Sequence, residues 1–590
     1  MRLVNLKITN FRNLDGTGLS LNPDINFLIG ENDMGKSNLL DMLETLFNHR
    51  RFLEEDFSDP EKPIEIEFSL VLNEMEKGIF EDLFDPSQNE IINAIAKQES
   101  VDEDIRYFHK ESEEEIPYTR FRCSNYVKYD SLRTPKEELT FYKGRGVGKF
   151  LVYLVEKFIR QGTLPVTEDY IKKESLAPIV TYINSLLKQI RMFKDFSITA
   201  EVEEELTDLI YKMLTIRDSR GFQIQKIGYG VQFSVLIVLS ILEKLMSLIE
   251  DKRRKECIFT KDQQRSISLI LGLDEPEIHL HPYMQRSVVK YIRNILQNQD
   301  KAFSSLIKEL FDLDSIDGQA IIASHSPTVL LNQYKYLVRF YRKNSTIKMV
   351  SGNNISLDDA TEKHLLKNFP YIKESFFSRC AILVEGDTEY AALPLWAEKA
   401  IGDLDDLGIT VIQAGGAKSV PPVSKLLNEL KIQNVSIIDK DEYDRSQAAY
   451  DGTLNLYVTD YKNFEQEIVE NLIASKQTET LFDILRDREP TGLETRIQKT
   501  KLAQVAAKYE IQVTWTDKDY KFSEIYKKAK GIDINLVKAM FLSWLDKKSI
   551  TLGRAIGEKV ETVSIPPKYR TAIKKAKKYA EQYTTDNQNA

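Results

Sequence analysis

The sequence predicts an α/β protein in which two parallel-sheet units are separated by helical segments. Three observations lead to this fold class. An apolar run at 25–30 leads through a glycine-containing loop into a helix with an apolar stripe. Strand-like apolar runs return at 266–276 and 318–327. From Ser378 onward, short apolar runs alternate with helices, which is typical of a parallel sheet.

Length and composition bound the class of protein. The chain has 590 residues, of which 42 % are apolar and 29 % charged. This composition excludes collagen, low-complexity disorder and a polytopic membrane protein, and the length predicts two to four domains at about 100–200 residues each. The formal net charge of −9 excludes a uniformly basic nucleic-acid coat, although not a local basic groove.

The cysteines, the first residues and the most apolar stretch of the chain together predict a cytoplasmic protein without a membrane span. Three scattered cysteines predict neither a metal quartet nor a disulfide framework, and they favour a reducing cytosol. The first residues, MRLVNLKITNFRN, lack the apolar core of a signal peptide. The apolar stretch 231–250 contains Gln232, Glu243 and Lys244, which favours a buried helix.

The pattern along the chain divides it into four parts. Residues 1–90 read as strands around a helix, with Val4, Leu6 and Ile8 alternating along the first strand. Residues 91–215 are expected to form a helical insertion, with an acidic solvated loop at 97–115 and helices near 148–160, 168–192 and 200–216. Residues 216–375 return to strands. Residues 376–590 form a second parallel-sheet unit that becomes helical beyond 465.

The phosphate loop is the most specific motif. Gly30, Gly35, Lys36 and Ser37 complete the pattern G-x-x-x-x-G-K-[ST] between a strand and a helix. The glycines let backbone N–H groups face phosphate oxygens at a helix N-terminus. Lys36 is expected to reach the β- and γ-phosphates, and the Ser37 hydroxyl to bind Mg²⁺. The alternative is an ordinary strand-to-helix turn.

Two strand ends could complete a nucleotide site. The run LILGLDEP delivers Asp274 and Glu275 side by side, the first suited to Mg²⁺ and the second to orienting or deprotonating water. The run IIASHSP ends in His325, which can contact a γ-phosphate, although a lone histidine after a strand is usually a surface or capping residue. Acidic pairs at strand ends are also common in solvated turns.

A glycine-rich segment precedes the apolar helix at 231–250. Gly228, Gly230 and Gln232 stand at its start, where backbone N–H groups and the helix N-terminus form an anion cradle. The alternative is a simple turn that begins the helix.

The order of these four motifs resembles that in the ATP-binding-cassette ATPases of the SMC, Rad50 and RecF branch. The opening ITNFRN, the loop GENDMGKSN with Asn32, and the segment DEPEIHLHP are similar to that branch. The resemblance implies an ABC/SMC-like ATPase head that binds ATP through Asn32, Gly35 and Lys36. It further implies a homodimer or higher oligomer, in which Gly228, Gly230 and Gln232 of one copy close over the ATP of another.

A separate acidic constellation lies in the second unit. Glu385 follows the strand CAILV, and Asp439 and Asp441 follow the strand VSII, where an extended chain would point both to one face. Three converging carboxylates form a hard-oxygen site suited to Mg²⁺ or Mn²⁺. The alternative is the ordinary acidic rim of a soluble sheet.

The pair LVEGDTE and IIDKDEYD resembles the TOPRIM domain, and the domain order resembles the OLD (overcoming lysogenisation defect) family of nucleases. That family includes the large subunit of the Gabija system and effectors encoded beside retrons. The resemblance implies that residues 91–215 form a dimerisation arm and that residues 376–590 form a TOPRIM domain with a helical extension. It implies metal ligands beyond those derived above, and a basic residue at the scissile phosphate. The positions that match are Glu385, Glu389, Asp439, Asp441 and Glu465 for metal, Asp387 as a spare ligand, Gly415–Gly416 beside the site, and Lys548 or its neighbour Lys547 for the phosphate.

The leading hypothesis is an ATP-regulated, Mg²⁺- or Mn²⁺-dependent endonuclease for double-stranded DNA, which the resemblance places in anti-phage defence. Its partners would be a second copy and, in some settings, a helicase subunit or a retron reverse transcriptase with its RNA–DNA. One alternative is an ATP-driven clamp on DNA ends without nuclease activity. Another is a topoisomerase-like enzyme, which requires a tyrosine nucleophile and leaves a covalent adduct. The basic stretch 568–583 with its tyrosines could follow a nucleic-acid backbone or be a solvated helix face.

Overall fold

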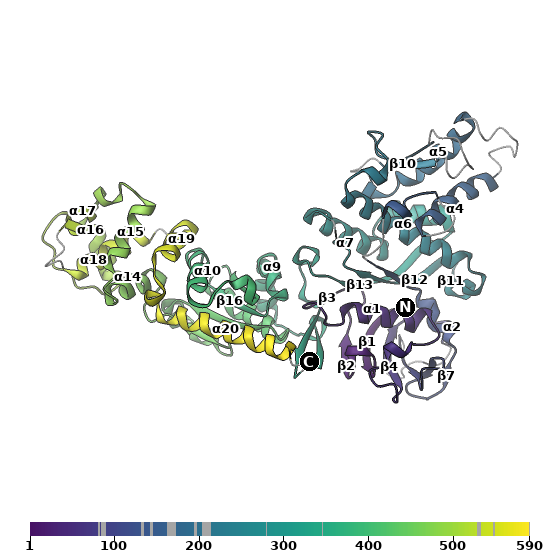
Figure 1. Ribbon diagram of the computed structural model, residues 1–590, viewed down its shortest axis with the longest axis horizontal. Coiled ribbons are helices and arrows are strands. Elements are labelled where there is room, and N and C mark those ends of the chain that lie inside the picture. Colours follow the sequence, from purple (N-terminus) through teal and green to yellow (C-terminus); the bar gives the residue numbers. More distant parts are fainter. Residues whose placement is uncertain are drawn as a thin grey trace. The chain divides into compact units, whose positions relative to one another are not determined.

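The computed structural model divides the chain into two compact units (Figure 1). The N-terminal unit comprises 1–341 with 346–354, and the C-terminal unit comprises 342–345 with 355–590. The structure describes residues 1–80, 83, 90–130, 135–141, 146–161, 173–193, 198–202, 214–278, 280–344, 346–527, 533–546 and 549–588.

One sheet of the N-terminal unit is antiparallel and is ordered β2-β1-β4-β5-β6-β7. Apolar and polar residues alternate along β4 and β5, so each buries one face, as period-two patterning requires. The strands are β1 (Arg2–Thr9), β2 (Thr17–Ser20), β4 (Ile64–Val71), β5 (Ile91–Gln98), β6 (Arg106–His109) and β7 (Glu115–Ile116).

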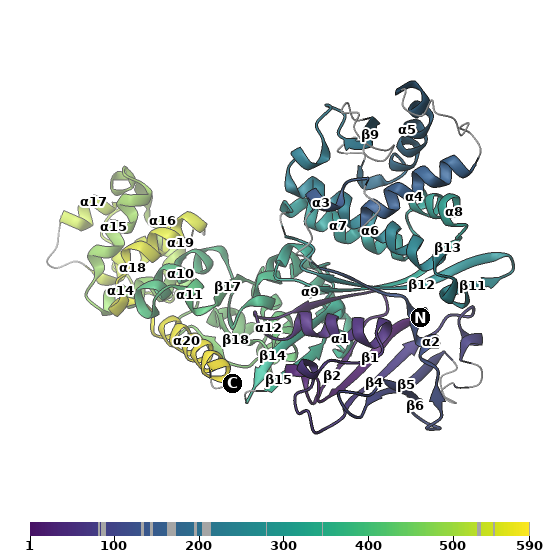
Figure 2. The ribbon, with the colours of Figure 1, turned by 45° about the vertical axis from the view of Figure 1, so that its right-hand side comes forward.

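The second sheet carries the nucleotide motifs. Its order is β11-β12-β13-β3-β14-β15, with β8 paired to the other side of β12, and the pairings of β12 with β13 and β8 and of β3 with β13 and β14 are parallel. Helix α1 (Lys36–Asn48) lies between the two sheets (Figure 2). The strands are β3 (Ile25–Ile29), β8 (Tyr126–Tyr129), β11 (Ile258–Lys261), β12 (Gln264–Asp274), β13 (Ser315–Ala323), β14 (Leu337–Lys343) and β15 (Thr346–Ser351).

Helices cover the face of the second sheet that is turned away from α1. Helix α6 (Tyr229–Glu250) is long and apolar enough to cross a membrane, yet 83 % of its most apolar window is buried within the unit, as expected of a core helix. The other helices are α2 (Tyr118–Phe121) at the antiparallel sheet, and α3 (Pro135–Glu138), α4 (Val147–Arg160), α5 (Lys173–Leu187), α7 (Pro282–Leu296) and α8 (Lys301–Phe311).

The expected insertion at 91–215 differs from the structure in two places. Residues 91–129 supply β5 to β8, so they belong to the two sheets rather than to a helical arm, and the acidic run at 97–115 contains β6 and β7. Charged residues there occupy the exposed positions of alternating strands. The helix expected at 200–216 is replaced at its ends by the antiparallel strands β9 (Thr199–Val202) and β10 (Leu214–Arg217).

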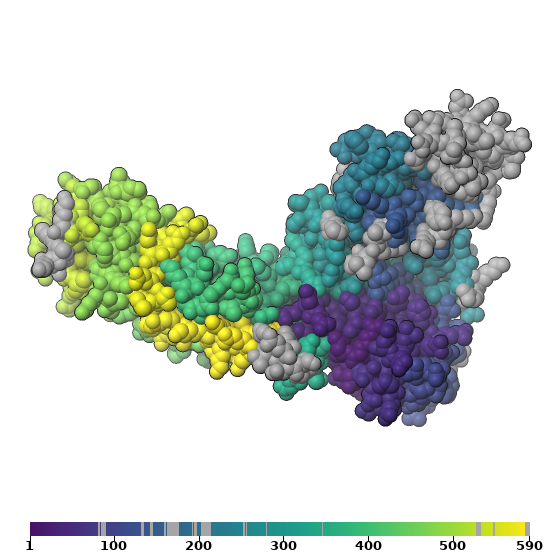
Figure 3. All heavy atoms as spheres, in the orientation of Figure 1, coloured from purple at the N-terminus to yellow at the C-terminus, as the bar shows by residue number. Residues whose placement is uncertain are grey.

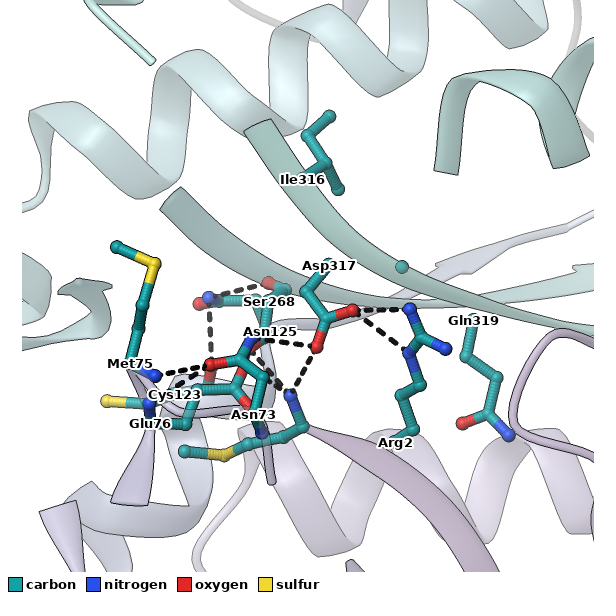
Figure 4. A network of polar contacts seen from close by, with 12 residues as sticks. Arg2, Asn73, Met75, Glu76, Cys123, Asn125, Ser268, Ile316, Asp317 and Gln319 are labelled. Atoms are coloured by element: carbon teal, nitrogen blue, oxygen red, sulfur yellow. Dashed lines mark hydrogen bonds and ion pairs between the residues drawn. The ribbon is translucent and has the colours of Figure 1, made fainter. Parts of the chain in front are cut away.

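A buried polar network joins the two sheets (Figure 4). The Met1 ammonium group contacts Glu76, donates to Ser268 Oγ at 2.9 Å and to Asp317 Oδ2 at 3.3 Å. Arg2 donates twice to Asp317 Oδ1, at 2.6 and 2.9 Å. Because Ser268 lies on β12 and Asp317 on β13, the network fixes β1 against the nucleotide-binding sheet.

The cysteines depart from the prediction. Cys123 and Cys257 form a disulfide, with Cα atoms 4.6 Å apart, although 134 residues separate them in sequence. Both lie in short 3-10 helices that pack against each other, a proximity that sequence spacing does not reveal. Cys380 is free and buried, and burial raises the pKa of its thiol.

The C-terminal unit is built on a parallel sheet of order β17-β16-β18-β19. Helices cover it, and the long α20 lies along the outside of the unit (Figure 3). The strands are β16 (Cys380–Val384), β17 (Ile409–Gln413), β18 (Gln433–Ile438) and β19 (Leu456–Val458); a small hairpin of β20 (Arg496–Gln498) and β21 (Asp519–Lys521) lies apart from them.

Helices make up most of the rest of this unit, as predicted for the region beyond 465. Their bounds are α9 (Asp359–Ile372), α10 (Asp387–Ile401), α11 (Leu404–Leu407), α12 (Val420–Glu429), α13 (Lys440–Arg445), α14 (Phe464–Ala474), α15 (Thr478–Arg488), α16 (Lys499–Lys508), α17 (Phe522–Lys527), α18 (Ile534–Leu545), α19 (Ile550–Lys559) and α20 (Pro567–Gln588).

Close packing of α19 on α10 supports the first turn of α10. A Cβ atom built on Gly553 would overlap Thr388 O and lie 2.9 Å from Ala391 Cβ. We expect Gly553→Ala to lower the free energy of unfolding by about 1–3 kcal/mol, the usual cost of overpacking. Thermal unfolding measures the effect. Gly78→Ala, which meets nothing within 4 Å, is the control, and equal stability of both variants would contradict the expectation.

Candidate functional sites

The phosphate loop has the conformation that the sequence predicts. It follows β3, and Gly35 stands before α1 in the left-handed region with φ of 80°. A Cβ at Gly35 would lie 2.7 Å from both Asn13 Oδ1 and Leu14 Cδ2, so glycine is required. Asn32 is exposed in the same loop. The loop therefore presents its backbone at the N-terminus of α1, where an anion is favoured.

Lys36 and Ser37 both point into this site. Lys36 is 5 % exposed, and its Nζ donates to Gly30 O at 3.0 Å and Glu31 O at 2.6 Å. Burial lowers the pKa of Lys36 to about 8, against the opposing charges of Glu275 and Asp274. Ser37 Oγ donates to Asp274 Oδ1 at 3.2 Å. A hydroxyl beside a carboxylate is the pair of oxygen ligands that Mg²⁺ accepts with a nucleotide.

The strand ends converge on the loop. Glu275 follows β12 with a left-handed φ of 46°, and its N–H donates to Ala323 O at 2.9 Å. Its Oε1 lies 3.4 Å from His325 Nε2. Burial, followed by the charge of Lys36, lowers the pKa of His325 to about 4, so the imidazole is neutral at pH 7. Burial also raises the pKa of Asp274.

Glu277 is a site residue that the motif analysis missed. It is nearly buried, and its Oε1 accepts from Ser324 Oγ at 2.6 Å and from the His325 N–H at 2.9 Å. Burial raises its pKa. Glu277 therefore orients the backbone of His325. Its position in DEPEIHLHP, two residues after Glu275, was the available signal.

In the glycine-rich segment before α6, the Gln232 side chain does not lie where the sequence predicts it. This side chain is 1 % exposed, and its Nε2 donates to Ile227 O at 2.7 Å and to Gln225 O at 3.3 Å. It therefore stabilises the turn before α6 rather than facing a nucleotide. Gly228 is exposed at the start of α6, and Gly230 is partly exposed in its first turn. Pairing of this segment with a second copy stays a prediction.

Lys36 predicts a pH dependence of ATP binding. Its pKa is about 8 without nucleotide, and phosphate charges in the site raise it. The protonated lysine therefore binds ATP more tightly, so the association constant is flat below pH 8. We expect it to fall above pH 8, approaching tenfold per pH unit. Titration of ATP at pH 7–9.5 measures this. Lys36→Arg is the control that removes the dependence, and a pH-independent wild type would contradict it.

The second site stands at one edge of the TOPRIM-like sheet. Strands β16 and β18 are parallel neighbours, with Leu383 beside Ser436. Glu385 follows β16 and Asp439 follows β18, so the two acids leave the sheet at the same edge. The Gly416 N–H donates to Glu385 O at 3.1 Å. This confirms that the end of β17 with Gly415–Gly416 also reaches the edge.

The expected extended geometry of Asp439 and Asp441 is wrong. Asp439 is the residue that begins α13, and Asp441 lies in the first turn of this helix. Asp439 is 2 % exposed, whereas Asp441 lies at the rim, 3.4 Å from Arg445 Nη2. The chain turns helical at once because the strand ends at Ile438, so the period of two no longer applies.

Buried carboxylates gather behind this edge. Glu389 is 3 % exposed and Glu465, in the first turn of α14, is 2 % exposed. Burial raises the pKa of the Tyr569 hydroxyl most. The negative charges of Glu389, Asp439, Glu467 and Glu465 raise it further. The four carboxylates therefore lie within electrostatic range of this hydroxyl. Burial raises the pKa of Glu467 itself to about 7.

The remaining acids occupy the rim. Glu385 lines a pocket of about 600 Å³. It also contributes, after burial, to raising the pKa of Tyr450 to about 12. Asp387 is exposed and accepts from Gln413 Nε2 at 2.7 Å, so it faces β17. A Cβ at Gly386 would lie 2.9 Å from Glu389 Oε2, so a side chain at this position would displace that carboxylate.

The donor set suits a hard divalent cation. In the part of the chain that the structure describes, no three Asp, Glu, His or Cys side chains form a ready metal cage. Mg²⁺ is usually held by one or two carboxylates together with waters and substrate phosphates, which Glu385 and Asp439 can supply from neighbouring strand ends. The all-oxygen donors therefore fit Mg²⁺ or Mn²⁺. The expected phosphate-binding Lys548 and its neighbour Lys547 lie outside the described residues.

The C-terminal stretch 568–583 is mainly structural. Helix α20 buries Tyr569, Ala572, Ile573 and Ala576 against the sheet, and Tyr579 donates its hydroxyl to Asn455 Oδ1 at 2.8 Å. Tyr569 and Tyr579 are therefore occupied by packing and a hydrogen bond rather than free to stack on bases.

Family models match both units. Residues 25–332 match the family described as "AAA domain, putative AbiEii toxin, Type IV TA system". Residues 376–441 match the "Overcoming lysogenization defect protein-like, TOPRIM domain". The first match spans more than half of the 590 residues. The chain belongs to this AAA-domain family and carries an OLD-like TOPRIM domain, which confirms the predicted class of an ABC/SMC-like ATPase head followed by TOPRIM.

Similar proteins match most of this chain or one part of it. The Old nuclease of Escherichia phage P2 is 24 % identical over 91 % of this chain and 92 % of its own length. The solved C-terminal region of the Xanthomonas campestris pv. campestris OLD protein is 21 % identical, covering 35 % of this chain and 99 % of that one, with a TM-score of 0.25. The SMC head domain from Thermotoga maritima is 15 % identical, covering 60 % and 100 %, with a TM-score of 0.29.

Proposed function

We propose that this chain is an ATP-regulated, divalent-metal-dependent endonuclease for double-stranded DNA. The observation that supports this most is that Glu385 and Asp439 leave neighbouring parallel strands at the same sheet edge, with Asp439 almost fully buried. Carboxylates at the carboxyl ends of neighbouring parallel strands are the oxygen donors that a hard divalent cation accepts, so this edge is a candidate cation site. We further propose that the protein acts in anti-phage defence in the cytoplasm, and that it does so as a homodimer or higher oligomer.

ATP chemistry follows from the residues of the phosphate loop. Lys36 would exchange its carbonyl partners for the β- and γ-phosphates, and Ser37 and Asp274 would hold the Mg²⁺ that accompanies the nucleotide. Glu275 takes the proton of the attacking water. Neutral His325, whose Nε2 lies 3.4 Å from Glu275 Oε1, has one ring N–H, which it donates either to that carboxylate or, once the nucleotide is bound, to the γ-phosphate.

DNA cleavage rests on the second site. Glu385 and Asp439 would hold Mg²⁺ or Mn²⁺, which polarises a phosphodiester and lowers the pKa of bound water. Glu389 and Glu465, fixed in the first turns of α10 and α14, keep this edge negative and would serve a second ion. Asp441, which is partly exposed at the rim, would be a further ligand to this metal. Occupancy of the ATP site gates access to this edge.

A second candidate function is an ATP-driven clamp on DNA ends. It is favoured by the lack of a ready three-ligand cage among the described residues. In that case the TOPRIM acids would be structural.

Plasmid cleavage separates these functions. We expect the chain to cut supercoiled plasmid with Mg²⁺ or Mn²⁺ and to be inactive in EDTA. Cleavage should survive Lys36→Ala, with altered dependence on ATP. Denaturant quench should release DNA free of protein, because a hydrolytic enzyme leaves no tyrosine adduct. Binding of linear DNA without cleavage under every metal and nucleotide condition would favour the clamp.

A further inference from the structure

A pocket of about 600 Å³ opens beside Glu385 in the C-terminal unit. Helix α9 forms one wall, the turn at Gly415–Ser419 forms another, and Glu442 of α13 lies at the far side. A second hollow of about 590 Å³ shares His364 and Lys418 with the first, so the two adjoin. Together they lead from the TOPRIM edge along α9 and α12.

Lysines dominate the charge of this hollow. Lys363 and Lys367 lie one turn apart on α9, on the same face, and Lys418 stands on the opposing turn. All three are exposed, and no ion pair among the described residues includes any of them. Lysines elsewhere on this unit are often paired, as Lys462 is with Glu510. The three ammonium groups are therefore available to an anion.

The glycine turn gives the pocket an open floor. Gly416 has a left-handed φ of 110°, and a Cβ at this position would meet nothing within 4 Å. Gly415 has φ of 74°, and a Cβ there would lie 2.9 Å from Asn368 Oδ1. Backbone at Gly416 can thus be approached closely by a ligand, because no side chain covers it.

We propose that Lys363, Lys367 and Lys418 form a lysine pocket that binds phosphates of the substrate strand next to the scissile phosphodiester. This inference rests on the proposed nuclease function and names how its substrate is held. Glu385 lines the same pocket, so a strand bound here runs directly to the metal edge. The adjoining hollow, lined by Lys425 as well, continues the path, which favours a strand over a free nucleotide.

Binding without cleavage tests the lysine pocket. The full chain is titrated against a fluorescein-labelled 20-nucleotide single strand in Ca²⁺ over a range of NaCl concentrations, by anisotropy. We expect Lys363→Ala/Lys367→Ala/Lys418→Ala to weaken binding at least about tenfold and to reduce the salt slope by about 2, since each single-strand phosphate contact contributes about 0.7. Lys418→Arg should retain binding.

A charge-matched variant controls for net charge. Lys499→Ala/Lys501→Ala/Lys518→Ala changes three exposed lysines of the same unit outside the pocket and should leave the slope within about 0.5 of wild type. Unchanged affinity and slope in the pocket variant would overturn the inference. A second result would also overturn it: free deoxynucleoside monophosphate competes with the strand for the wild type but not for the pocket variant, while the pocket variant still binds the strand with normal affinity.

Cleavage assays keep this inference separate from the proposed function. If the pocket variant cuts plasmid with a raised KM and an unchanged kcat, both are supported. If the pocket variant cuts plasmid with an unchanged KM and binds the strand with an unchanged salt slope, the lysine pocket is refuted and the nuclease function is not. A wild type that binds the strand through these lysines but never cuts DNA refutes the nuclease and supports the pocket.

Discussion

Asp439→Asn is expected to lower DNA cleavage about 10³-fold, equivalent to about 4 kcal/mol of transition-state stabilisation. The amide keeps the shape of the side chain but removes the negative charge that holds a divalent cation. Because Asp439 is almost fully buried at the start of α13, solvent cannot replace the lost ligand. Initial rates of plasmid cleavage in Mn²⁺ measure the effect.

The control for this variant lies on the same helix. Asp444→Asn removes an exposed charge and should cleave at the wild-type rate. ATP hydrolysis should be unchanged in both variants, since the ATP site is in the other unit. Mn²⁺ should raise the thermal midpoint of the wild type and of Asp444→Asn but not that of Asp439→Asn. Wild-type cleavage by Asp439→Asn would remove this carboxylate from the mechanism.

Glu275→Gln is expected to lower ATP hydrolysis about 10²- to 10⁴-fold while leaving ATP affinity nearly unchanged, because an amide cannot accept the proton of the attacking water. Lys36, Ser37 and Asp274, which bind the nucleotide, keep their contacts. Phosphate release under single-turnover conditions gives the rate, and titration with ATP gives the dissociation constant. The variant should therefore hold unhydrolysed ATP.

A matched control exists for the unusual backbone at this position. Asp262 is also acidic and left-handed, with φ of 51°, and is exposed in the turn between β11 and β12. Asp262→Asn should hydrolyse ATP normally. Normal hydrolysis by Glu275→Gln would show that another group activates water. Loss of ATP binding together with hydrolysis would instead indicate that the substitution disturbs the strand end.

Local patterns were sufficient to predict the elements that frame the two sites. The phosphate loop, α1, β12 and the end of β13 follow from periodicity and from residues with one dominant conformational role, such as Gly35. The errors occur where non-local pairing decides. Residues 97–115 are acidic enough to read as a solvated loop, yet 106–109 within them pair with β5 on one side and β7 on the other in the antiparallel sheet.

The candidate sites show the same division. Asp274, Glu275 and His325 could be predicted because each ends a buried strand of one sheet, and parallel strands bring their carboxyl ends together. The burial of Gln232, the contact of Glu277 with His325, and the lysines of α9 depend on how separate elements pack. The disulfide between Cys123 and Cys257 has the same origin. Spacing marks Glu277 as a candidate, two residues after Glu275, but it does not encode the contacts themselves.

Tyr569 carries a consequence for biosynthesis. Helix α20, which buries this ring against the sheet, is translated after every strand of that sheet. A ribosome-bound chain therefore holds Glu389, Asp439 and Glu465 without their last packing partner until α20 has left the exit tunnel. The sheet that carries the proposed cutting site consequently gains its α20 cover only after all of its strands have been synthesised.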